Sequence, residues 1–224
     1  MNLTNKQVKE KYNRYSLVYD LFQWPLEKVL FSKWRKNLLR EAQGRVLEIG
    51  VGTGKNLPYY NPYYNYGDSY EKVRLTAIDI SAEMLRKAQK KVKEVKEKQK
   101  KATGNLPVKL QLVNSENLPF KDNHFDCIVN TFVLCSVSDP EMMLKEMKRV
   151  LKAQGRILML EHVLSKNKLI AFFEKVHNPL TKFFLGVNIN RNTTAAIKKA
   201  GLKIVKEKNL ALVDVFKEIE VRKY

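Results

Sequence analysis

The chain has 224 residues, of which 44% are hydrophobic, and this length and composition suit one globular domain with a full core. Two cysteines form no disulfide framework, the first residues lack the apolar run of a secretory signal, and no stretch approaches the roughly 18 apolar residues of a membrane span. We therefore expect a cytoplasmic protein. The net charge of +19 favours contact with polyanions, either nucleic acid or anionic lipid, or reflects solvated lysines on helix faces.

Residues 4–43 carry apolar side chains at spacings of three and four, which predicts amphipathic helices that are interrupted near Pro25. Lys and Arg side chains, among them Arg35, fill the other face. Basic helices with Trp and Phe are candidates for a membrane interface. A cap packed on the following domain is the alternative, and both interpretations can hold together.

A glycine-rich loop follows the first predicted strand. Residues 46–49 are mostly apolar, and Gly50, Gly52 and Gly54 come directly after them. Glycine permits positive φ and lets a ligand approach the backbone. A strand that runs into such a loop and then a helix is where open α/β sheets bind nucleotides. Position 55 is not glycine, so the dinucleotide pattern GxGxxG is not satisfied, and the acid Glu48 would repel a pyrophosphate and attract a cation or an amine.

The run Glu48-Ile-Gly-Val-Gly-Thr-Gly54 resembles the first motif, ExGxGxG, of the class I methyltransferases that use S-adenosylmethionine (SAM). SAM carries a sulfonium and an α-amino group but no phosphate, which suits an acid beside the loop. An accidental glycine-rich turn is the alternative. The resemblance implies an α/β, Rossmann-like, seven-stranded sheet, mostly parallel with an antiparallel last strand and helices on both faces. It also implies that Glu48, the three glycines and Asn56 contact the cofactor.

A surface loop over residues 61–70, a strand over 75–79 and a helix after Ser81 are predicted next. An acid at the end of this strand, Asp79, can accept hydrogen bonds from both ribose hydroxyls. Ser81 is a natural N-cap, which leaves Asp79 free for a ligand. The run from Asp79 to Met84 resembles the second family motif, which implies that Ile80 and Met84 flank the adenine. The many lysines of the helix form a solvated face or, alternatively, a nucleic-acid groove, although no aromatic residue is interleaved for bases to stack on.

The third predicted strand, residues 109–113, is followed by Asn114-Ser-Glu-Asn-Leu-Pro-Phe120. This run resembles the family motif D-A-E-x-L-P-F, whose acid contacts the adenine amino group. Asn114 and Ser115 replace the acid and the alanine, and an Asn carbonyl can still accept from that group. The resemblance therefore assigns Asn114, Ser115 and Glu116 to the cofactor.

Residues 125–129 are the core of a fourth strand, and the residues from Asn130 onward follow its carboxyl end, where open sheets bind ligands. Asn130 and Thr131 are predicted beside the cofactor, and Phe132 and Cys135 beside the acceptor. The NPPY-like motif of many amine-methylating enzymes is absent, and the apolar loop suits a lipid or another hydrophobic acceptor better than a DNA base. Nothing near Cys135 activates it as a nucleophile, which favours a packed thiol.

Asp139 and Pro140 predict a helix start, and residues 157–161 predict a fifth strand that ends at His162. A base there could accept a proton from an amine or hydroxyl acceptor, and a structural histidine is the alternative. No spacing of His, Cys or acids suggests a metal site. Residues 164–190 alternate basic and bulky apolar residues, which predicts an acceptor lid or a membrane contact.

Two further stretches resemble particular branches of the family. The run Tyr15-Ser-Leu-Val-Tyr19-Asp20 is similar to the YD signature of quinone and phospholipid methyltransferases, which implies that Tyr15 and Asp20 bind the acceptor and that Tyr19 is a catalytic candidate. The run from Gly186 to Thr193 resembles a stretch of bacterial phosphatidylethanolamine N-methyltransferases, in which Arg191 could pair with a phosphate or shape the lid. A helix N-cap cluster is the alternative for Asn192 and Thr193.

The resemblance covers nearly the whole chain and implies the type 11 group of SAM-dependent methyltransferases, with S-adenosylhomocysteine as product. It divides the domain into a helical cap (1–43), a SAM-binding core (44–163), a lid insertion (164–190) and a carboxyl-terminal helix and strand pair (191–224). The expected acceptor is a phosphatidylethanolamine-like head group, reached by peripheral contact with an anionic membrane on its inner face. Alternatives are C-methylation of a quinone precursor, S-methylation of a small thiol, or a nucleic-acid-binding module with a vestigial SAM fold. Methyl transfer from a sulfonium mainly needs positioning and desolvation.

Overall fold

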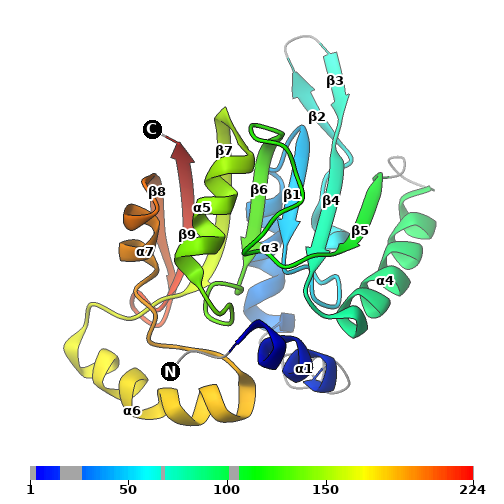
Figure 1. Ribbon diagram of the computed structural model, residues 1–224. Helices are drawn as coiled ribbons and strands as arrows, with labels where there is room; N and C mark the ends of the chain where they lie inside the picture. Colours follow the sequence, from blue (N-terminus) through cyan, green and yellow to red (C-terminus); the bar gives the residue numbers. More distant parts are fainter. Residues whose placement is uncertain (1–3, 16–26, 67–68, 101–105, 224) are drawn as a thin grey trace.

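The computed structural model describes residues 4–15, 27–66, 69–100 and 106–223. Seven strands form one sheet in the order β5-β4-β1-β6-β7-β9-β8 (Figure 1). The five strands from β5 to β7 are parallel, and β9 runs antiparallel to both of its neighbours. The predicted fold, with an antiparallel last strand, is confirmed. The strands are β1 (Arg45–Ile49), β4 (Arg74–Asp79), β5 (Val108–Leu112), β6 (Phe125–Thr131), β7 (Leu151–His162), β8 (Leu202–Ala211) and β9 (Phe216–Lys223).

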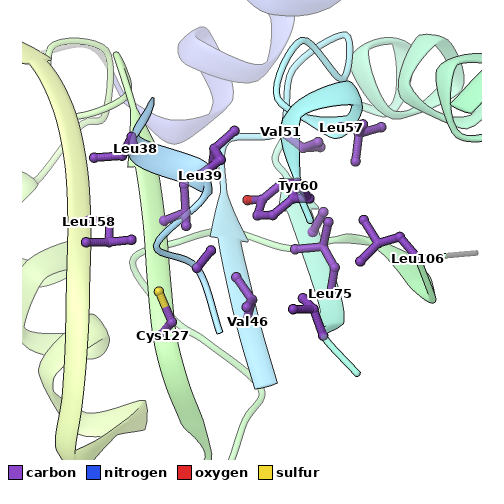
Figure 2. Packing of buried hydrophobic residues seen from close by; sticks show 14 of the residues in the cluster. Leu38, Leu39, Val46, Val51, Leu57, Tyr60, Leu75, Leu106, Cys127 and Leu158 are labelled. Atoms are coloured by element: carbon purple, nitrogen blue, oxygen red, sulfur yellow. The ribbon is translucent and has the colours of Figure 1, made fainter. Parts of the chain in front are cut away.

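Helices cover both faces of the sheet and bury two separate hydrophobic clusters. Alternation along each strand sends neighbouring side chains to opposite faces, so Val46 joins one cluster and Leu47 the other. Leu38 and Leu39 of α3 (Ser32–Leu39) pack in the same cluster as Val46 and Leu158 (Figure 2). On the other face, α5 (Pro140–Val150) and α7 (Thr193–Lys199) cover the second cluster. Four side chains of α5 are buried, as its helical spacing predicts: Met143, Leu144, Met147 and Val150.

Helix starts follow the predicted capping residues. Asp139 accepts hydrogen bonds from the backbone N–H groups of Glu141 and Met142, with Pro140 in the first helical turn. Ser81 Oγ accepts from Met84 N at 3.2 Å at the start of α4 (Ala82–Lys100). Asn192 caps α7 through Ala195 N. A 3-10 turn, η2 (Leu57–Tyr59), follows the glycine loop.

Two predicted boundaries are wrong. The loop predicted over 61–70 contains β2 (Tyr63–Tyr66) and β3 (Ser69–Lys72), which pair as an antiparallel ribbon, because tyrosines favour strands even between turn residues. The fifth parallel strand begins directly after α5 at Leu151, six residues earlier than predicted, and a register shift opposite Phe125 and Cys127 accommodates its irregular start.

The amino-terminal region is helical, as predicted, in three described pieces: α1 (Asn5–Tyr15), the π-helix η1 (Glu27–Phe31) and α3. The predicted break near Pro25 lies outside the described residues. The segment predicted as a lid forms α6 (Lys168–Leu185), which lies beside α1 beyond one end of the sheet (Figure 1). Among the described helices, none is both long enough and apolar enough to cross a bilayer.

Candidate active site

A pocket lies at the carboxyl ends of the central parallel strands, with α1 as one of its walls. This is the position at which open α/β sheets bind ligands. Predicted cofactor residues that line it come from four strand ends and the loops behind them. They are Gly50, Gly52, Asp79, Ile80, Met84, Asn114, Ser115, Glu116 and Thr131, and the predicted acceptor residue Phe132 lines it as well.

The three glycines of the loop are needed for different reasons. All have positive φ, and a Cβ on Gly50 would meet the Val133 side chain at 2.4 Å. Gly54 does not line the pocket; a Cβ there would meet Leu57 at 2.8 Å and the Ala88 Cα of α4 at 3.3 Å. A Cβ on Gly52 would meet no protein atom within 4 Å. Gly52 therefore leaves open space at the pocket wall, where a ligand can approach the backbone.

Asp79 closes the loop from the neighbouring strand. Its Oδ2 accepts from Gly52 N at 2.8 Å and its Oδ1 from Ser81 N at 2.9 Å, so the carboxylate is not free, contrary to the prediction. Burial raises the pKa of Asp79, and the backbone hydrogen bonds oppose this rise. A carboxylate has about four acceptor positions, so these backbone donors leave capacity for a ligand hydroxyl.

The adenine-side residues are partly occupied by local hydrogen bonds. Asn114 Oδ1, the predicted acceptor for an adenine amino group, accepts from Glu116 N at 3.0 Å. The Glu116 carboxylate accepts from Asn5 Nδ2 and from Asp139 N, both at 2.8 Å. Since Asn5 also accepts from Ser138 Oγ at 2.9 Å, Glu116 fastens the start of α1 across the pocket.

Glu48 lies behind the loop instead of beside the ligand. It is 1% exposed, does not line the pocket, and accepts from Asn56 Nδ2 at 2.9 Å and from Tyr60 OH at 3.0 Å. Burial raises the pKa of Glu48 to about 7, against the effect of these two hydrogen bonds and of Arg35. Asn56 is equally buried and lies outside the pocket lining, because its amide serves this network.

Arg35, assigned by the sequence to the exposed basic face, is 5% exposed. Its Nη1 donates to Asn56 Oδ1 at 2.7 Å and to Thr131 Oγ1 at 2.8 Å, and its Nε donates to Glu27 at 3.0 Å. The guanidinium also lies 5.4 Å from the centroid of the Phe132 ring. A signal for its burial was present in the sequence, because position 35 falls on the apolar stripe of α3.

The loop after β6 is held in a strained conformation. Phe132 has a φ of 58°, which an aromatic residue rarely adopts. Glu161 Oε1 accepts from the next two backbone N–H groups, Val133 at 3.1 Å and Leu134 at 3.2 Å, and so fixes this loop. Burial raises the pKa of Glu161 to about 8. Sequence reasoning gave Glu161 no role. The neighbouring prediction, Asn130, is fully buried, does not line the pocket and has no side-chain hydrogen bond among the described residues.

Three further predicted site residues, His162, Cys135 and Arg191, are not among the described lining residues of the pocket. His162 packs edge-on against Phe216, and burial lowers its pKa to about 4, so it is neutral and a poor base at pH 7. Cys135 is buried with its Sγ 3.5 Å from Phe132 O, and burial raises its pKa to about 12, as a packed thiol requires. Arg191 Nη2 donates to Val137 O at 2.6 Å and so helps to hold the pocket loop.

Three predictions in the YD segment cannot be placed. Tyr19 and Asp20 lie outside the described residues, and Tyr15 ends α1 with a side chain that is not described. Among the described residues, no group of His, Cys, Asp and Glu side chains could hold a metal ion.

The pocket and the rest of the chain differ in charge. In a chain of net charge +19, the described lining residues include two acids, Asp79 and Glu116, and no Lys, Arg or His. The open space over Gly52, the ribose-side acid and this lining fit a cofactor that carries positive charge and hydroxyls but no phosphate. These features define a Rossmann-like protein with a cofactor site at the carboxyl end of its sheet.

Comparison with known proteins gives the particular family. A family model described as a methyltransferase domain matches residues 47–159, and the chain belongs to this family. A phosphatidylethanolamine N-methyltransferase of Cereibacter sphaeroides is 37% identical over 59% of this chain and 57% of its own length. A ubiquinone/menaquinone biosynthesis C-methyltransferase of Yersinia enterocolitica is 33% identical over 66% of this chain and 54% of its own length. The chain thus matches little more than half of each relative.

Among solved structures, the cyclase SpnF has a TM-score of 0.73 at 16% identity, over 100% of this chain and 97% of its own. This likeness supports the fold alone, because one fold hosts several chemistries. The family match places the chain among methyltransferase domains, which use SAM as methyl donor. SAM supplies an activated methyl group on a positively charged sulfur. In this pocket, the cofactor could approach the backbone at Gly52. The Asp79 carboxylate would accept hydrogen bonds from its hydroxyls, and Ile80 and Met84 would form an apolar wall.

Proposed function

We propose that this enzyme N-methylates the amine of a phosphatidylethanolamine-like head group at a membrane surface. The observation that carries the proposal is the contrast between the acidic pocket lining and the basic chain around it. A pocket lining without Lys, Arg or His does not repel an amine, while the surrounding positive charge attracts the phosphate of the same lipid. A relative that bears the name phosphatidylethanolamine N-methyltransferase supports this choice of acceptor.

The chain's own residues serve this reaction by positioning and by exclusion of water. The Arg35 network and Glu161 fix the pocket loop from behind, and Phe132 presents an apolar ring to the acceptor side. The attacking amine needs a free electron pair, so it loses its proton to solvent or to a carboxylate before the methyl group is transferred. A neutral His162 away from the lining takes no part in this step.

C-methylation of a quinone precursor is the second candidate. The Yersinia relative supports it, and so do the apolar lining residues Phe132, Val133 and Val137, which suit a ring as well as a lipid chain. A carbon nucleophile of this kind carries no positive charge. It also carries no phosphate for the basic surface of the chain to attract, which is why we favour the amine head group.

The two acceptors can be separated in one experiment. Purified enzyme is given radiolabelled SAM with vesicles that contain either phosphatidylethanolamine or a demethylated quinol, and the lipids are resolved by chromatography. We expect label in monomethyl-phosphatidylethanolamine. Label in the quinol fraction alone would replace our proposal by the second candidate. Label in neither lipid, with transfer to a small thiol, would refute both.

A further inference from the structure

Helix α6 exposes a continuous apolar stripe. Five large side chains on it are more than half exposed, at spacings of three and four that place them on one side of the helix. Monomeric proteins rarely leave such a contiguous apolar face in water, and it commonly marks a contact surface. The exposed fractions are Leu169 66%, Phe172 61%, Phe173 53%, Val176 53% and Leu180 56%.

A second apolar element lies next to the start of α6. The turn between β8 and β9 carries Leu212 and Val213, which are 66% and 68% exposed and have φ of 48° and 64°. Left-handed backbone is strained for ordinary residues, and more so for a branched one such as Val213. Asparagine and glycine adopt this left-handed backbone with less strain. Packing gives no reason for two strained, exposed hydrophobic residues here.

Hydrogen bonds join the two elements into one surface. Asp214, the residue after the turn, accepts from Ser165 Oγ and from Lys166 N, the latter at 2.8 Å. The turn is therefore fixed beside the start of α6. We call this surface the apolar rim; it consists of Leu169, Phe172, Phe173, Val176, Leu180, Leu212 and Val213.

The exposed Lys, Arg, Asp and Glu side chains of α6 and of the two residues before it are all lysines. Lys166, Lys168 and Lys175 are exposed, whereas Glu174, the only acid in α6, is 7% exposed and accepts from Ser165 N at 2.9 Å. Apolar side chains with flanking lysines match the boundary between head groups and acyl chains in an anionic membrane. A surface that stays in water has no use for exposed apolar side chains. A contact with another protein does not require that all neighbouring charges be positive.

The apolar rim is coupled to the active-site pocket. The segment after α6 bonds to the pocket loop, where Asn188 N donates to Cys135 O at 2.8 Å. Near the end of the helix, Lys11 of α1 donates to Lys182 O at 2.6 Å. A membrane that contacts α6 would therefore lie at the edge of the molecule where the pocket is found.

We propose that the apolar rim docks this enzyme on anionic lipid bilayers. Phe172, Phe173, Leu212 and Val213 enter the head-group boundary, and the lysines of α6 lie at the level of the phosphates. This inference rests on the proposed function, because an enzyme that methylates a membrane lipid must contact the membrane.

The test uses co-sedimentation with phosphatidylglycerol/phosphatidylcholine vesicles and with pure phosphatidylcholine vesicles. The informative variant is L212N/V213G, because Asn and Gly tolerate the positive φ of these two positions and should preserve or raise stability while the change removes both apolar side chains. A second variant, F172S/F173S, changes the helix. Val205→Ser, which replaces a residue 46% exposed on β8 outside the apolar rim, is the matched control.

We expect wild type and V205S to bind the anionic vesicles, and both rim variants to bind at least tenfold more weakly. Equal binding by all four proteins, or no binding by wild type, would overturn the docking surface. So would a wild-type dimer in gel filtration that becomes monomeric in the rim variants without loss of vesicle binding, since the rim would then be a contact between two copies.

Methyl transfer to a short-chain, water-soluble phosphatidylethanolamine separates this inference from the proposed function. Rim variants should retain that activity, because their pocket is intact. If wild type binds vesicles through the apolar rim but methylates no amine lipid, the proposed acceptor is wrong and the docking surface stands.

Discussion

Arg35 Nη1 lies 2.8 Å from Thr131 Oγ1 and links helix α3 to the strand end that lines the pocket. The same guanidinium holds Asn56, and Asn56 holds Glu48 behind the glycine loop. One buried network therefore joins the amino-terminal helices, the glycine loop and the pocket floor. Such networks are costly to break because each lost partner leaves another polar group buried and unpaired.

Replacement of Arg35 by Met should therefore destabilise the fold and weaken SAM binding together. Loss of one partner of a buried ion pair typically costs about 3–5 kcal/mol. Urea unfolding measures the first effect and calorimetry with SAM the second. Lys36→Met on the exposed side of the same helix is the control and should change neither. An R35M protein with wild-type stability would show that the network contributes nothing.

The glycines provide a pair of substitutions with opposite expected effects. Gly52→Ala should cost only about 1–2 kcal/mol for its positive φ, yet lower SAM affinity at least about tenfold, because the new methyl group enters the pocket. Gly54→Ala should lose more stability, since its Cβ would press on Leu57 and Ala88. Folded G54A should bind SAM with nearly wild-type affinity. If G54A lost SAM affinity and G52A lost more stability instead, the pocket geometry would be contradicted.

Asp79→Asn tests the charge of the ribose-side acid, because asparagine has the same shape as aspartate. The amide oxygen can still accept one backbone N–H, but the charge and one acceptor are lost. We expect about a tenfold or greater loss of SAM affinity in calorimetry, consistent with the higher strength of hydrogen bonds to charged groups. Equal affinity in both proteins would mean that Asp79 only supports the loop.

Glu161 should make stability depend on pH. Burial raises its folded pKa to about 8, whereas the unfolded value is near 4.3. The folded state thus binds the proton of Glu161 more tightly than the unfolded state. The contribution of this proton to the free energy of unfolding is therefore complete below about pH 4 and is lost as pH rises toward 8. In Glu161→Gln this loss should disappear. The stability difference, E161Q minus wild type, should grow between pH 5 and 8, by at most about 1.4 kcal/mol per pH unit.

Urea unfolding at several pH values measures this difference. Glu48, whose pKa is also raised, is present in both proteins and cancels in the comparison. Parallel stability curves for the two proteins would show that Glu161 does not titrate in this range.

The order of elements and the cofactor end of the sheet could be predicted from sequence because they follow local signals. Alternating apolar runs indicate the strands, and residues such as Asp139 and Ser81 indicate helix starts. The tyrosines of β2 and β3 misled the prediction, because turn residues surround them. A strand pair of this kind depends on cross-strand contacts, which a single stretch of sequence does not display.

The site was predicted less completely, for a related reason. Motif spacing indicates which residues approach the pocket, but not which way each side chain points. Glu48 and Asn56 belong to the motif yet face Arg35, and Arg35 looks like any surface arginine until its partners 21 and 96 positions away are known. The roles of Glu161 and Glu116 likewise depend on backbone N–H groups supplied by distant segments.

The hydrogen bonds that hold α1 at the pocket affect the turnover rate of the enzyme. Asn5 joins Glu116 and Ser138, and Asn13 accepts from Ser81 Oγ at 2.6 Å, so hydrogen bonds near both ends hold α1 as one wall of the cofactor pocket. We expect each round of catalysis to require these few side-chain contacts to open and close again. We expect the opening of this gate, and not the methyl displacement, to limit the turnover rate.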